Sequence, residues 1–158
     1  MTKRMFLGAV AAIVFTTAAG AQQLPLPYGS PVTLAQAKKI VAAAEQSAQS
    51  HNFTMAFAVV EPSGELVLFH RMDGTQYGSD LVAREKARTA ARFKRSTKAF
   101  FDTIAGGRNA VLSLPGVVAI EGGTPIVVNG QIVGAIGVSG GTSEQDGEVA
   151  AAALRGLE

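Results

Sequence analysis

Four arginines recur at helical spacing in the middle of the chain. Arg84, Arg88, Arg92 and Arg95 follow an i, i+4, i+8, i+11 pattern, which places them on one stripe of a predicted helix. The segment 80–102 carries seven basic and three acidic residues, so it is locally positive. Guanidinium groups present forked N–H donors that match a carboxylate. The stripe is therefore either a solvated face or a site for a small anionic ligand or a neighbouring subunit.

The chain has only two histidines and no cysteine. His70 ends a predicted strand, beside Arg71 and Asp73, and is a candidate contact for a ligand or metal. The ordinary alternative is a surface or hydrogen-bonded histidine. His51 follows a predicted helix and is expected to interact with the helix dipole. Without cysteine, disulfides, thiolate chemistry and cysteine-based zinc or iron–sulfur sites are excluded.

The sequence contains no persuasive catalytic set. The pattern Gly137-x-Ser139-x-Gly141 matches a nucleophile elbow, but it follows a strand with no helix directly behind it, so a glycine-rich loop is the preferred interpretation. Phosphate-binding and dinucleotide-binding loops are absent from the sequence. An enzyme acting on a small hydroxy acid or aldehyde would have to use Asp80, Glu121 or Lys86. Whether the chain is an enzyme stays open on these residues.

The first 21 residues have the pattern of a secretory signal peptide. Lys3 and Arg4 precede the apolar run 5–15, and Ala19-Gly20-Ala21 forms a small-residue cleavage site. The run is shorter than the ~20 residues that a membrane-spanning helix needs. We therefore expect cleavage after Ala21, a periplasmic or secreted protein, and no stable membrane span afterwards. The rest of the chain has twelve basic and twelve acidic residues, so the whole-chain pI of about 9.2 does not predict nucleic-acid binding.

The remaining residues predict a tether, 22–32, and one domain, 33–158. Three prolines make the tether extended. Thr33 and Gln36 predict a capping box for a helix that ends near residues 51–52. Further helices are expected over 81–94, capped by Ser79 or Asp80, and over 96–104 and 144–157.

Two tight turns predict two hairpins. Pro62-Ser63-Gly64 joins the runs 55–61 and 65–71, and Asn129-Gly130 joins 126–128 and 131–138. A fifth short apolar run spans 117–120. The first two runs are largely apolar, which predicts burial on both faces. The pattern indicates an α/β (α+β) domain with a mostly antiparallel sheet flanked by helices.

Four motifs in order resemble the GlcG/HbpS family, the haem-degrading, DUF336-type domains. The motifs are Glu85 to Ala90, Pro115-Gly116 with Glu121 to Ile126, Asn129 to Gly140, and Gln145-Asp146. Together they extend the match from Leu34 to Leu157. The resemblance implies a profilin-like sheet of about five antiparallel strands and a homo-oligomer.

The resemblance also implies a function. Some family members bind haem, secreted ones are linked to haem or iron handling and sensing, and others accompany glycolate or diol operons. It therefore favours an exported haem-binding protein. The alternative is a small-molecule enzyme or accessory protein of hydroxy-acid, glycolate-type metabolism. Family haem ligation points to Thr89, while Arg84, Arg88 and Arg92 would hold the propionates and His70 is a further contact.

Overall fold

The structure, a computed structural model, describes residues 25–157. The predicted signal peptide, 1–21, lies outside these residues. Within them, four strands form one antiparallel sheet in the order β2-β1-β4-β3. The strands are β1 (Ala56–Val60), β2 (Leu66–Arg71), β3 (Gly123–Val128) and β4 (Gln131–Ser139). The helices are α1 (Leu34–Ser50), α2 (Gly78–Phe93), α3 (Thr97–Ala105) and α4 (Ser143–Leu154), with short 3₁₀ turns at Asn109–Ser113 and Arg155–Leu157.

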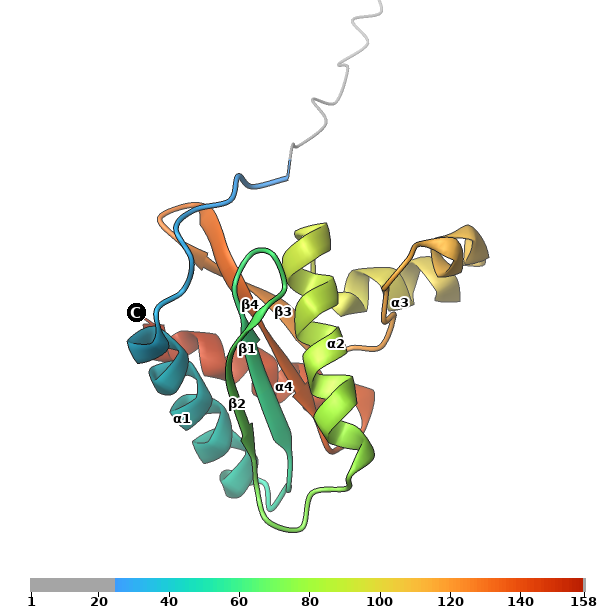
Figure 1. Cartoon of the computed structure of the whole chain (residues 1–158). Coiled ribbons are helices and arrows are strands. Elements are labelled where there is room, and N and C mark those ends of the chain that lie inside the picture. The colour runs from blue at the N-terminus through green and yellow to red at the C-terminus, as the bar shows by residue number, and fades with distance from the viewer. Residues whose placement is uncertain (1–24, 158) are drawn as a thin grey trace, which may run out of the picture.

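Helices cover both faces of the sheet (Figure 1). Helices α1 and α4 pack together on one face, and α2 crosses the other, while α3 and the turn after it extend to the side. Alternation along β1 divides its side chains between the two layers. Phe57 and Val59 enter the core under α1 and α4, whereas Ala56 and Ala58 face α2.

The α2 layer is built almost entirely from small side chains. Its buried cluster consists of Val60 and seven alanines from β1, β4 and α2. Because alanine side chains are short, the helix backbone approaches the sheet closely. This close packing fixes the position of α2 against the sheet. The charged side chains on the outer face of α2 are therefore held in defined positions.

Several local predictions are confirmed. Thr33 caps α1 in a capping box with Gln36, and both hairpins form. Burial on both faces is confirmed for β1, which is fully buried, but is wrong for the edge strand β2, which is only half-buried.

Other local predictions need correction. The run 117–120 is not a strand, because the N–H of Val118 bonds to the Thr89 side chain instead of to a neighbouring strand. Neither Ser79 nor Asp80 caps α2, which begins earlier, after Tyr77, without a side-chain cap. The last helix ends at Leu154 rather than residue 157, and continues as a 3₁₀ turn.

The extended tether is attached to the domain. Tyr28 forms a parallel bridge with Ile132, whose N–H donates to the carbonyl of Pro27 at 2.9 Å. The Tyr28 hydroxyl also donates to the carbonyl of Ala91 at 2.9 Å. The tether thus joins β4 to the end of α2. No helix within residues 25–157 is long and apolar enough to cross a membrane.

Candidate ligand-binding site

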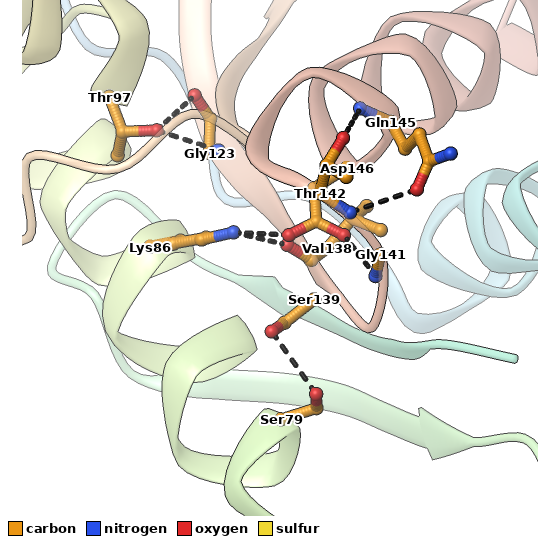
Figure 2. A network of polar contacts seen from close by, with 10 residues as sticks. All are labelled: Ser79, Lys86, Thr97, Gly123, Val138, Ser139, Gly141, Thr142, Gln145 and Asp146. Carbon is orange, nitrogen blue, oxygen red and sulfur yellow. Dashed lines mark hydrogen bonds and ion pairs between the residues drawn. The ribbon is translucent and has the colours of Figure 1, made fainter. Parts of the chain in front are cut away.

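A buried ion pair connects the two faces of the sheet. Lys86 of α2 and Asp146 of α4 approach to 2.6 Å between Nζ and Oδ2, with side chains only 1% and 4% exposed. The Lys86 ammonium also donates to the carbonyl of Val138 at 3.1 Å, and Asp146 Oδ1 accepts from the N–H of Gly141 at 3.0 Å (Figure 2). The pair therefore joins α2 and the end of β4 to the first turn of α4.

The loop before β3 closes over this pair. A Cβ on Gly122 would lie 2.9 Å from Lys86 Nζ and 2.7 Å from the Val138 carbonyl, and its φ of +121° favours glycine. The next residue, Gly123, donates its N–H to the Thr97 hydroxyl at 2.9 Å (Figure 2). Gly122 is thus required by close packing against the Lys86 ammonium, and Gly123 by its close approach to the backbone carbonyl of Lys86.

Burial raises the pKa of Asp146 above its usual range, while its hydrogen bond with Lys86 acts in the opposite direction. Because the pair is dry, it holds three segments together rather than contacting a ligand. Sequence analysis missed it, although a signal was present: Lys86 lies among Ala83, Ala87 and Ala90, on the face that α2 buries.

Thr89 is fully buried and its hydroxyl has two partners. Its Oγ1 donates to the carbonyl of Gly116 at 3.1 Å and accepts from the N–H of Val118 at 3.0 Å. The side chain therefore fixes the loop before β3. In this conformation it presents no ligand atom to solvent.

Two arginines of the predicted stripe hold the β1–β2 turn. Arg88 Nε donates to the Gly64 carbonyl at 3.2 Å, and Arg92 Nε donates to the Ser63 carbonyl at 2.7 Å. Arg88 also pairs with Glu85 at 2.6 Å. Both guanidinium groups are thus partly committed to the hairpin.

Arg84 is placed differently from the other two. Its guanidinium carbon lies 4.4 Å from the centre of the Phe69 ring. Within residues 25–157 it has no carboxylate partner or hydrogen bond. Leu81, one turn before it, and Tyr77, two turns before it at the start of α2, are 66% and 85% exposed. This end of α2 therefore presents a cation beside apolar surface.

His70 lies on the edge strand β2, on the face opposite to the one on which Phe69 lies beside Arg84. Its ring stacks on Phe57, a residue of the core under α1, and its Nε2 faces Glu45 of α1. The hollow next to it is lined by Glu45, Gln49, Arg71, Met72 and Asp73.

The structure thus distributes the five predicted site residues over four places. Arg88 and Arg92 lie at the β1–β2 turn and Arg84 lies beside Phe69. Thr89 lies under the loop before β3, and His70 lies on the α1 side of β2.

The alternative catalytic candidates do not converge. Asp80 pairs with Arg71 at 3.1 Å, Lys86 pairs with Asp146, and Glu121 packs against Gly147. Ser139 is buried and shares a hydrogen bond of 3.2 Å with another serine, Ser79.

The fold is that of a small α+β domain with an antiparallel sheet. The chain belongs to the family described as "Haem degrading protein HbpS-like", whose model matches residues 32–155. The predicted family and fold class are therefore confirmed, with four strands in the sheet of the described residues rather than about five.

Three relatives illustrate the similarity. Protein GlcG of Escherichia coli K12 is 43% identical over 65% of this chain and 77% of its own length. A variant of HbpS from Streptomyces reticuli has a crystal structure with a TM-score of 0.75 and 28% identity, covering 95% of this chain and 99% of that one. A crystal structure described as a PduOC:heme complex has a TM-score of 0.72 and 26% identity, covering 80% and 94%.

Proposed function

We propose that this chain is an exported haem-binding protein that acts in haem or iron handling or sensing. Membership of the HbpS-like family and the likeness to a haem complex support this proposal. The observation from this chain that carries it is Arg84, an arginine without an acidic partner among the described residues, set beside exposed apolar side chains. Haem needs that combination, because it has a broad apolar ring and two carboxylates.

The residues at this end of α2 fit the propionate side of haem. Arg84 would hold a propionate, and Phe69, Tyr77 and Leu81 would contact the ring. Arg88 and Arg92 add positive charge nearby, although their Nε groups are occupied by the turn. When bound, haem supplies an iron centre for redox or oxygen chemistry; the residues here bind and orient it.

Contact with the haem iron would require a change in one of two side chains. Thr89 would have to release Gly116 and Val118, and His70 would have to turn away from Glu45. We propose these two residues as alternative iron contacts. His70 is the more accessible, with a side chain 40% exposed.

A haem held by Arg84 would be only partly covered by one chain, since Tyr77 and Leu81 beside it are 85% and 66% exposed. We therefore propose a homo-oligomer in which another copy covers the rest.

Replacing Arg84 by Gln is expected to weaken haemin binding at least about tenfold. A charge-assisted hydrogen bond is worth about 1.5–3 kcal/mol, and 1.4 kcal/mol corresponds to a factor of ten. The measurement is a haemin titration followed by the Soret absorbance, which should saturate at a fixed stoichiometry in the unaltered protein.

The matched control is the pair Lys38→Gln with Lys39→Gln on α1, which removes two exposed cations from elsewhere and should leave affinity unchanged. Equal affinities for Arg84→Gln and the unaltered protein would contradict the propionate assignment. Absence of any saturable Soret change would contradict haem binding itself and favour the alternative in hydroxy-acid metabolism.

The oligomer is expected to depend on the apolar arm formed by α3 and the turn after it. Phe101, Leu112 and Leu114 are between 40% and 64% exposed there, and Ile120 in the loop that follows is 45% exposed. Exposed apolar patches of this kind mark interfaces. Leu112→Glu should dissociate the oligomer, as measured by light scattering. Leu34→Glu, at a leucine 49% exposed on α1, is the control and should not. A monomeric unaltered protein at micromolar concentration would remove the proposal.

Export is expected to remove residues 1–21. The intact mass of protein recovered from the periplasm or medium should correspond to a chain beginning at Gln22. A soluble cytoplasmic product that keeps Met1 would show that the segment is not a cleaved signal.

A further inference from the structure

The pair of Glu45 and His70 joins two rigid elements at the sheet edge. Glu45 lies in the fourth turn of α1, and His70 lies in β2. The imidazole is held by stacking on Phe57, with ring centroids 6.0 Å apart and planes 10° apart. Its Nε2 is 3.4 Å from Glu45 Oε2. The direction in which this nitrogen points is thus fixed by the core.

The contact is not a hydrogen bond. A charge-assisted bond between imidazole and carboxylate would bring the two atoms to about 2.7–2.9 Å. His70 Nε2 is instead buried without a hydrogen-bond partner, one of two such side-chain atoms in the described part of the chain. Burial of an unsatisfied polar atom is costly, so its position calls for a partner.

The spacing is that of two ligands of one metal ion. Histidine nitrogen and carboxylate oxygen bind Zn²⁺ at about 2.0–2.2 Å in tetrahedral geometry, which sets two ligand atoms about 3.3–3.5 Å apart. We propose that Glu45 Oε2 and His70 Nε2 bind a divalent cation of the zinc class. This site lies on the other face of β2 from Arg84, and it shares only His70, one of the two proposed iron contacts, with the proposed haem site.

The rest of the coordination shell is open. No third His, Asp or Glu joins these two in a group that could enclose an ion within residues 25–157. The hollow of about 350 Å³ beside them is also lined by Gln49, Arg71, Met72 and Asp73, which leaves room for water ligands. The Arg71 guanidinium is paired with Asp80. The Glu45 side chain is 34% exposed and lines this hollow, so an ion can reach it from solvent. The site is therefore a two-point, exchangeable one.

The test is a titration of the purified, haem-free protein with ZnCl₂ in competition with a chromophoric chelator. We expect one ion per chain, with affinity lowered at least tenfold by His70→Asn and by Glu45→Gln. His51→Asn is the matched control, since it removes the other histidine, which has no carboxylate partner among the described residues. Circular dichroism checks that each variant is folded.

A second readout separates ligation from indirect effects. Zinc should shift the NMR signals of the His70 ring and leave those of His51 unchanged. Failure to bind one ion per chain, or equal zinc affinities for His70→Asn and the unaltered protein, would overturn the site and reduce the pair to an ordinary contact. The two proposals fail separately, because Glu45→Gln changes no proposed haem contact and Arg84→Gln changes no proposed zinc ligand.

Discussion

Replacing Asp146 by Asn is expected to lower the free energy of unfolding by about 3–5 kcal/mol. The change removes the negative charge but keeps an oxygen that can accept from the Gly141 N–H. Lys86 would then be a buried cation whose remaining contact is the Val138 carbonyl. An uncompensated charge at 1% exposure cannot recover its lost hydration, which is why breaking one side of the pair is costly.

A second variant separates the charge from the packing. Lys86→Met together with Asp146→Asn removes both charges and retains an unbranched side chain in the space below Gly122. Because buried ion pairs are often replaceable by neutral residues of similar volume, the double variant should recover most of the lost stability. Urea unfolding followed by circular dichroism measures both. A double variant as unstable as Asp146→Asn would show that packing, not the charge, sets the cost.

Local patterns were sufficient for most of the fold. The box of Thr33 and Gln36 involves residues three apart, and the Asn129-Gly130 turn needs only two residues in left-handed conformations, with φ of 50° and 73°. Such features are encoded in adjacent residues. They fixed the hairpins and helix positions, although the start of α2 was missed because its first turn has no capping side chain.

The candidate site was harder to predict from the sequence, since its contacts join segments that are far apart along the chain. Lys86 and Asp146 are 60 residues apart, and Thr89 reaches Val118 across 29. Helical spacing correctly grouped Arg84, Arg88 and Arg92 on α2, but it wrongly included Arg95, because the helix ends at Phe93. Only the folded chain shows that Arg88 and Arg92 contact the β1–β2 turn. Helical spacing predicts which residues share one face of a helix, but it does not predict which other segment of the chain packs against that face.

Adding one methyl group to Gly137 is expected to destabilise the domain by about 3 kcal/mol. A Cβ at this position would overlap the carbonyl of Ala83 and lie 2.6 Å from the backbone nitrogen of Ala87. Both atoms belong to the backbone of α2, so relief requires moving the helix away from the sheet. That movement would also strain the Lys86 contacts at the end of β4.

Gly78→Ala is the control for Gly137→Ala. Both variants add one methyl group: Gly137 lies in β4 against α2, and Gly78 is in α2 itself. Gly78 begins α2, its φ is not positive, and its added Cβ would meet no atom within 4 Å. It should leave stability unchanged or raise it by about 0.4–1 kcal/mol, since alanine restricts the unfolded chain. Urea unfolding of the two variants tests the close approach directly. Equal stabilities would mean that α2 can shift outward at little cost, and that the alanine layer does not fix its position.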